Sequence, residues 1–337
     1  MNLTNKVLAF VFSVTVLSNS LLGGGLTWSD AHLAEWRDRA VNGPYKSAGD
    51  AFDPLIPGEW QRIVKNKNTF AADPSADRLS SYWTTTPDAY TFIANHIKMG
   101  DAAFYSLVKQ DTALAIVVKD ELMWHANAAG MQVSPTYYHR TDGGTWSRAE
   151  WVARLVMYAD YVKKQFSTAE RTTFDAWISD WAYSYEGSIH SELSNTLWGD
   201  RYDRSYTTNL GSTAYTPSYD GHAYMDTNGI NQWQVGSANR WYNNRRASCM
   251  HLVGIAAVWL NDSVLKDRAK LFWEEYIQFC VFPDGSTAEF SRNSASSPNT
   301  GLLYTASTLK AAISVAEALR LSGDSSLYNY SSSNGHW

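Results

Sequence analysis

The chain has 337 residues, of which 45% are hydrophobic and 18% charged, so it can bury a large core, and these values exclude disorder as its main state. Its formal net charge of −5 provides no global basic field for nucleic acid or a membrane surface, so any bound polyanion must be held by a local cluster of cations. The 15 Trp and 20 Tyr residues suit either a large core or a groove that stacks sugar rings.

The first 25 residues have the pattern of a secretory signal peptide. Lys6 precedes an apolar run over residues 7–17, and small and polar residues continue to Gly25. The run is shorter than the ~20 residues that a membrane-spanning helix needs. We therefore predict a leader over residues 1–25, one domain over 26–337, a secreted or periplasmic location and no stable membrane insertion.

Most of the remaining chain has helical periodicity, and several helix starts carry capping signals. Thr86-Pro87 provides an N-cap and an N1 proline, and Ser147 with Glu150 forms the spacing of a capping box. The same spacing recurs before the helix predicted over 167–185, at Ser167 and Glu170. One face of that helix, at i, i+3, i+4 and i+7, carries Phe174, Trp177, Ile178 and Trp181.

The predicted helices come as adjacent pairs joined by short turns, such as FSTAE and LNDSV. Strand signals are few, and further helical runs lie at residues 101–125, 245–260, 262–280 and 302–322. A long series of helical hairpins favours an all-α fold, with the hairpins arranged in an α/α toroid that forms an incomplete barrel. Cys249 and Cys280 lie in apolar helical context, so one disulfide bond and two free thiols stay equally open.

Two segments interrupt the helical pattern, residues 43–83 and 198–240, and both are rich in Gly, Tyr, Trp, Asn and Asp. Loops of this length inside a compact domain usually build a site, so we expect them to line a groove. In the first segment, Tyr45 and Lys46 form either a lid over a ligand or a plain surface loop. Candidates for stacking on sugar rings, or equally for core packing, are Trp233, Trp241 and Tyr242.

A dense polar cluster stands in front of the buried helix predicted from about residue 245. The free N–H groups and the positive dipole end of a helix N-terminus favour an anion. The cluster therefore describes either a receptor for a carboxylate or sulfate, or ordinary capping by Asn with surface arginines. Its members are Arg240, Asn243, Asn244, Arg245 and Arg246.

A second constellation follows the Asp284-Gly285 turn, where an acid, an arginine and a tyrosine lie on one connection between helices. These residues are Glu289, Arg292 and Tyr304. Together, the two stretches resemble the C-terminal half of the alginate lyase superfamily of polysaccharide lyases. Members carry an Asn-Asn-His motif opening a buried helix, then a helix ending in an Asp-Gly turn, a Glu, an Arg and a final helix with Tyr. The resemblance covers residues 240–330.

The resemblance implies an α/α toroid with a groove for an acidic polysaccharide, and β-elimination without a metal or other cofactor. In that reaction the C5 proton beside a uronate carboxylate is removed and the 4-O-glycosidic bond breaks. By the match, Asn244 neutralises the carboxylate, Arg292 is its electrostatic partner and Tyr304 accepts or donates a proton. The chain departs from the family in having Arg245 at the position of the catalytic His, and Ser307 at that of a later tyrosine.

These departures leave the general base open. His222 and His190 lie on or near predicted loops and are the leading histidine candidates, ahead of His139. His251, two helical turns after Asn244, fits a buried or groove-floor histidine better than a base.

The leading hypothesis is an exported lyase acting on an alginate- or glucuronan-like polymer. One alternative is an inverting glycoside hydrolase, in which Glu289 would pair with Asp220 or Asp226 across the cleft. Another is a carbohydrate-binding protein derived from a lyase, which the substitution of Arg245 for the catalytic His makes a serious alternative.

Overall fold

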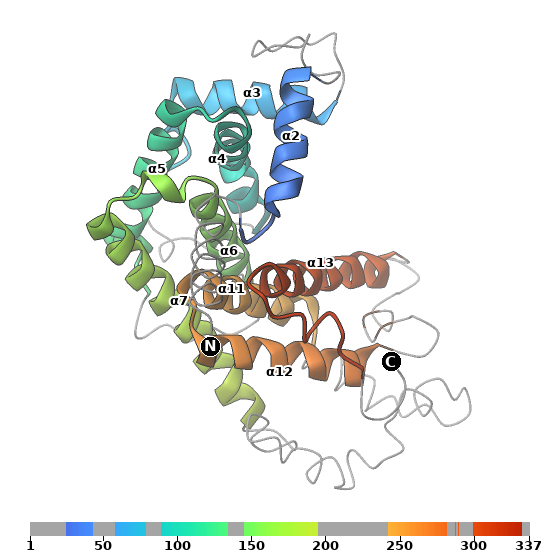
Figure 1. Cartoon of the computed structure of the whole chain (residues 1–337). Helices are drawn as coiled ribbons and strands as arrows, with labels where there is room; N and C mark the ends of the chain where they lie inside the picture. The colour runs from blue at the N-terminus through green and yellow to red at the C-terminus, as the bar shows by residue number, and fades with distance from the viewer. Residues whose placement is uncertain are drawn as a thin grey trace, which may run out of the picture.

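The computed structural model describes residues 25–42, 58–78, 89–133, 145–194, 242–281, 287, 289 and 299–331 (Figure 1). These residues are almost entirely helical, which confirms the predicted all-α class, and their one β-bridge joins Val281 to Thr287. The α-helices are α2 (Asp30–Asn42), α3 (Glu59–Ala72), α4 (Ala89–Lys109), α5 (Thr112–Asn127), α6 (Thr145–Tyr161), α7 (Thr168–Ser194), α11 (Asn244–Leu260), α12 (Ser263–Cys280) and α13 (Thr300–Leu321). Two short 3-10 helices are η2 (Ala129–Met131) and η3 (Lys163–Gln165).

The helices pack in two rows (Figure 1). In one row α4, α6, α11 and α13 lie side by side in that order, and in the other α5 contacts α7, and α7 contacts α12. Three helical hairpins connect the rows: α4 packs on α5, α6 on α7, and α11 on α12. Helices α2 and α3 both pack on α4. None of the described helices combines the length and apolar character needed to cross a membrane.

Two of the hairpin turns use the same local chemistry. Gln110 and Asn261 adopt left-handed backbone conformations, with φ of 57° and 54°, and an Asp follows each of them. The Asp111 amide donates to the Ser106 carbonyl at 3.0 Å, and the Asp262 amide donates to the Ala257 carbonyl at 2.9 Å, the 6→1 bond of a Schellman motif. Each Asp side chain then caps the next helix by accepting a backbone N–H, from Leu114 and Leu265 respectively.

The predicted capping box at the start of α7 is confirmed. The Ser167 amide donates to Glu170 Oε2 at 2.8 Å, and the Glu170 amide donates to Ser167 Oγ at 3.3 Å. Lys119 of α5 donates to the same carboxylate, and these bonds lower the pKa of Glu170 to about 2. The predicted apolar stripe is also confirmed, since all four of its members are buried: Phe174, Trp177, Ile178 and Trp181.

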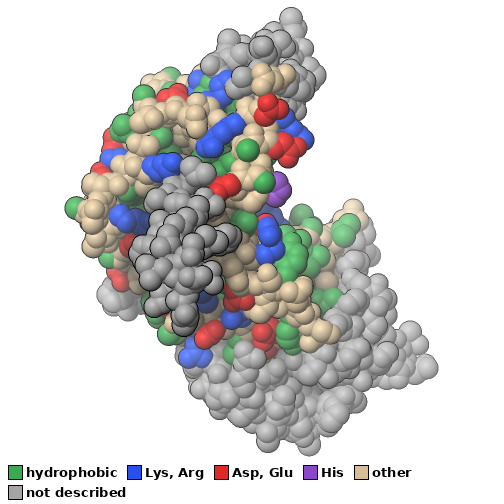
Figure 2. All heavy atoms as spheres, viewed as in Figure 1, with side chains coloured by type: hydrophobic (Ala, Val, Ile, Leu, Met, Phe, Trp, Pro, Cys, Tyr) green, Lys and Arg blue, Asp and Glu red, His purple; other side chains and the backbone are tan. Residues whose placement is uncertain are grey.

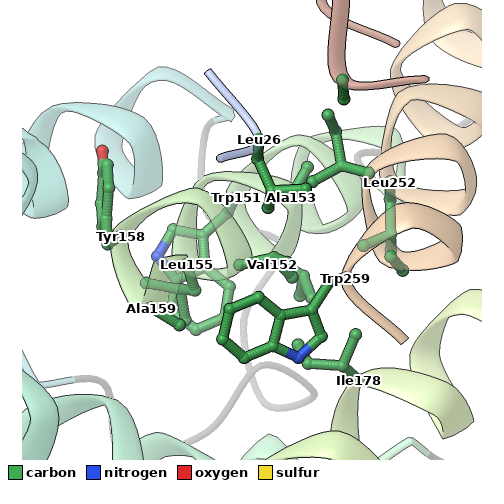
Figure 3. Packing of buried hydrophobic residues seen from close by; sticks show 14 of the residues in the cluster. Leu26, Trp151, Val152, Ala153, Leu155, Tyr158, Ala159, Ile178, Leu252 and Trp259 are labelled. Atoms are coloured by element: carbon green, nitrogen blue, oxygen red, sulfur yellow. The ribbon is translucent and has the colours of Figure 1, made fainter. Parts of the chain in front are cut away.

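The core is one cluster that draws buried side chains from every described α-helix from α2 to α13, and Figure 3 shows the part of it around α6, α7 and α11. Figure 3 shows Trp151, Val152 and Leu155 of α6 with Ile178 of α7 and Leu252 and Trp259 of α11, all of which are buried. The largest fully buried side chains are Trp151, Trp181, Trp273, Tyr185, Tyr242, Tyr276 and Phe174. Much of the aromatic content therefore fills the core.

Three predicted helix boundaries are wrong. The helical run predicted over residues 101–125 is two helices, because α4 continues through Gly100 to Lys109 and α5 begins at Thr112; a side chain at Gly100 would overlap the ring of Tyr158. Ser147 is not an N-cap, because α6 begins at Thr145 and Ser147 is fully buried. The interrupted segment 43–83 contains α3, whose buried stripe of Trp60, Ile63, Val64 and Phe70 stands among polar residues.

Both cysteines are free and buried, so the structure contains two thiols and no disulfide bond between them. The predicted leader (residues 1–24 of it), the Thr86-Pro87 signal and the second interrupted segment lie outside the described residues.

The crossing of α11 and α13 depends on Gly254. A Cβ at this position would lie 2.6 and 2.7 Å from the two γ-methyl groups of Val315. We expect Gly254→Ala to lower the free energy of unfolding by about 1–3 kcal/mol through overpacking, which outweighs the ~0.5–1 kcal/mol that Ala gains over Gly in a helix. Urea unfolding measures this difference.

Two further variants test the cause. At Gly187 of α7 an added Cβ would meet no neighbour within 4 Å, so Gly187→Ala should instead stabilise the protein by about 0.5–1 kcal/mol. Val315→Ala should cost less in the Gly254→Ala background than in the wild type, because it removes the clashing methyl groups. Simple additivity of the two changes would contradict the clash.

Candidate functional site

A cleft of about 430 Å³ opens where α6, α11 and α13 meet. Figure 1 shows these helices converging at the centre of the molecule. The residues that line the cleft are Trp146, Glu150, Arg154, Met157, Tyr158, Asn244, Arg245, Ser248, His251, Leu303, Tyr304, Ser307, Lys310, Ala311 and Ser314.

The cleft brings together three of the predicted catalytic residues. Asn244 and Arg245 open α11, and Tyr304 is the fifth residue of α13, about sixty positions later in the chain. Asn244 is largely buried, whereas Arg245 and Tyr304 are partly exposed. The contact between α11 and α13 places them around one cavity.

The N-terminus of α11 is satisfied from within the protein. Asn243 Oδ1 accepts hydrogen bonds from the amides of Arg245 and Arg246 at 3.0 and 3.1 Å. The Asn244 amide donates to Glu289 Oε1 at 2.6 Å, and Glu289 is only 1% exposed. A helix N-terminus attracts an anion, and here the anion is a carboxylate of the same chain.

The predicted backbone receptor for an external anion is therefore wrong. Asn243 and Glu289 are caps of α11, and neither lines the cleft. Arg246 is buried and also lies outside the cleft lining. Of the two alternatives, the structure supports ordinary capping of α11 by Asn243. The buried carboxylate of Glu289 completes this cap, and its distance along the sequence hides that role.

Tyr242 does not stack on a ligand. It is 1% exposed, packs on the ring of Phe272 and donates its hydroxyl to Glu275 Oε2 at 2.7 Å. Burial of both partners makes this a core hydrogen bond, so the prediction of a sugar-binding Tyr242 is wrong.

Three cationic groups and one carboxylate surround the cleft. Arg154 Nη2 lies 3.0 Å from Glu150 Oε1, one turn earlier on α6, and the Arg154 side chain also bonds Tyr158. Lys310 reaches the cleft from α13, and Arg245 from α11. Burial and then the charge of Arg154 lower the pKa of Lys310, a shift that Glu150 partly opposes. Cations therefore predominate among the described lining residues, in a protein whose net charge is negative.

His251 lies in the floor of the cleft. Its Nε2 is 2.9 Å from Ser314 Oγ, and the side chain is 7% exposed. Burial, with smaller contributions from Lys310 and Arg154, lowers the pKa of His251 to about 3. The imidazole is therefore neutral and too weakly basic to serve as an efficient general base near neutral pH, in accord with its prediction as a groove-floor residue.

The sequence interpretation missed Arg154, Lys310, Glu150 and Tyr158. For Arg154, Lys310 and Glu150 the signal is a charged side chain among apolar residues of a helical run, with Glu150 and Arg154 at a spacing of i, i+4. On α13, Tyr304, Ser307, Lys310 and Ser314 recur at i, i+3, i+6 and i+10 and share one face.

Other predicted site residues cannot be placed relative to the cleft. His190 belongs to α7, but its side chain lies outside the described residues. The remaining residues outside the described ranges are Tyr45, Lys46, His139, Asp220, His222, Asp226, Trp233, Arg240, Trp241 and Arg292.

Among the described residues, no group of three or more His, Cys, Asp or Glu side chains is placed to hold a metal ion. The cleft instead offers amide, guanidinium and ammonium groups, which are suited to an anion, and phenol groups, which are suited to proton transfer. The chain matches no protein-family model, no curated protein and no solved structure.

Proposed function

We propose that the protein is an exported polysaccharide lyase that cleaves a uronate-containing polymer by β-elimination. Export rests on the leader predicted over residues 1–25. The two rows of helices, joined by hairpins, support an α/α toroid that is open on one side. The observation that carries the proposal is the single cleft shared by Asn244, Arg245 and Tyr304.

The charge of the cleft suits the first requirement of this reaction. The C5 proton of a uronate becomes acidic enough to remove only when its carboxylate is neutralised and the developing negative charge is stabilised. The side-chain amide of Asn244 and the guanidinium of Arg245 are the proposed partners of that carboxylate, since both residues line the cleft. Arg154 and Lys310 add positive charge on the opposing helices.

A phenol supplies the second requirement, a group that moves protons. We propose that Tyr304, acting as a phenolate, accepts the C5 proton, and that the phenol so formed returns this proton to the leaving 4-oxygen as the C4–O bond breaks. The C5–H electrons form the new C4–C5 double bond, so the products are an unsaturated sugar and a shortened chain. Arg245 replaces the family's histidine as a permanent cation and takes no part in proton transfer.

The hydrolase alternative finds less support in the described part of the cleft. An inverting hydrolase needs two carboxyl groups about 6.5–9.5 Å apart. Among the described lining residues the one carboxylate is Glu150, which is paired with Arg154, and Glu289 is buried as a cap of α11.

Incubating the purified protein with alginate and glucuronan tests the proposal. A lyase raises the ultraviolet absorbance of the solution, because each cut creates a conjugated double bond. Reducing ends without that absorbance would select a hydrolase. Binding of the polymers without new ends would select a carbohydrate-binding protein, and both results would overturn the proposed activity.

A further inference from the structure

A second cavity of about 500 Å³ adjoins the cleft along α13. Its walls are α13 and the segment that precedes α2, and it shares Lys310 and Ser314 with the cleft. We call it the aliphatic groove. Its lining residues are Leu26, Thr27, Ala306, Leu309, Lys310, Ile313, Ser314 and Glu317.

The aliphatic groove exposes apolar side chains to water. Leu309 and Ile313 lie one turn apart on α13 and are 39% and 60% exposed, while Leu26 is buried. Figure 2 shows hydrophobic side chains gathered over α13, on the wall of a hollow between α13 and α2. Exposed apolar side chains that lie together in a hollow offer a surface for an apolar ligand.

The two cavities differ in the chemistry of their walls. The cleft presents the rings of Trp146, Tyr158 and Tyr304, which suit the face of a sugar. No aromatic side chain appears among the described residues that line the aliphatic groove. Branched aliphatic walls instead suit a flexible hydrocarbon chain, whose burial gains ~25 cal/mol for each Å² removed from water.

Charge sets the direction of such a ligand. Lys310 stands at the junction of the two cavities, near Arg154, and an anion placed there would offset the repulsion between these cations. Glu317 lies two turns further along α13, roughly 10 Å by the helical rise. Its carboxylate is paired with Arg320 at 2.5 Å, so its charge at the far end is compensated.

We propose that the aliphatic groove and the cationic junction together bind an amphiphilic carboxylate of the medium-chain fatty acid class. The carboxylate pairs with Lys310, and the hydrocarbon chain runs over Leu309 and Ile313 toward Glu317. This site is additional to the proposed lyase activity and does not depend on it. Its occupant would compete with a uronate for Lys310 alone.

Isothermal titration calorimetry of the full chain with octanoate tests the proposal. We expect saturable binding of octanoate, with at least about tenfold weaker binding of both butanoate, which has a shorter chain, and octylamine, which has the opposite charge. Absence of octanoate binding, or equal binding of octylamine, would overturn it.

Matched variants on α13 locate the site. Ile313→Gln and Lys310→Gln should each weaken octanoate binding by about tenfold. Leu302→Gln should leave the affinity unchanged, because Leu302 is 58% exposed on the same helix and lines neither cavity. Circular dichroism and the urea midpoint establish that each variant is folded. Equal affinity of folded Ile313→Gln and wild type would refute the assignment.

Discussion

Tyr304→Phe should lower the turnover of a cleaved uronan by about 10²–10⁴-fold, the usual contribution of a positioned acid–base group. The substitution removes one oxygen from the lining of the cleft and keeps the ring, which in the proposed complex contacts the sugar. Because Asn244 and Arg245 still meet the carboxylate, KM should change little, and the loss should fall on kcat. Initial rates of ultraviolet absorbance over a range of polymer concentrations separate the two.

Two further variants test whether the loss of turnover is specific to the Tyr304 hydroxyl. Ser307→Ala removes a hydroxyl from the same face of α13, where Ser307 bonds the Leu303 carbonyl, and should leave kcat within about twofold of the wild type. Tyr158→Phe removes the other phenol of the cleft. If Tyr158→Phe abolishes turnover and Tyr304→Phe does not, Tyr304 is not the proton acceptor.

Acid should destabilise the folded protein strongly, through its buried histidines. Burial lowers the pKa of His251 from its ordinary 6.5 to about 3, and the charges of Lys310 and Arg154 add to this shift. Between these two pH values the unfolded chain is protonated at His251 and the folded protein is not. The contribution of the neutral His251 to the free energy of unfolding is therefore fully present above pH 6.5 and is lost as the pH falls toward 3. At pH 4.5 the loss from His251 alone is about 2–3 kcal/mol. His125 adds to it with the same sign, because burial, His96 and Arg78 lower its pKa.

Urea unfolding at a series of pH values from 7.5 to about 4.5 measures this dependence. His251→Gln is the informative variant, since its side chain can still reach Ser314 Oγ but does not titrate. The variant should lose less stability than the wild type between these pH values. Identical slopes for the two proteins would show that the folded protein protonates His251 as readily as the unfolded chain.

The parts of the fold that sequence predicts well are local. The Ser167–Glu170 box and the Asn261-Asp262 turn are made by residues within a few positions of one another, so their chemistry is present in the linear pattern. The Ser147–Glu150 spacing shows the limit of such patterns. Ser147 is buried in the core inside α6, and Glu150 forms an ion pair with Arg154 in the cleft.

The cleft depends on contacts that no local pattern contains. Asn244 and Tyr304 can be linked in advance by resemblance to a family, but Arg154 enters from α6 because α6 packs on α11. In the same way, Glu289 reaches the Asn244 amide from 45 positions away. The sequence pattern assigns Asn243 and Glu289 to a ligand because a capped helix end and an anion-binding helix end have the same local sequence.

The internal capping of α11 separates foldability from ligand choice. Since Asn243 and Glu289 complete the helix end without outside help, α11 does not need an occupant in the cleft to remain ordered. In the proposed complexes recognition rests on side chains such as Arg245 and Lys310, which line the cleft and do not cap α11. Substitutions at these two positions should therefore alter the choice of anionic ligand and leave the capped end of α11 in place.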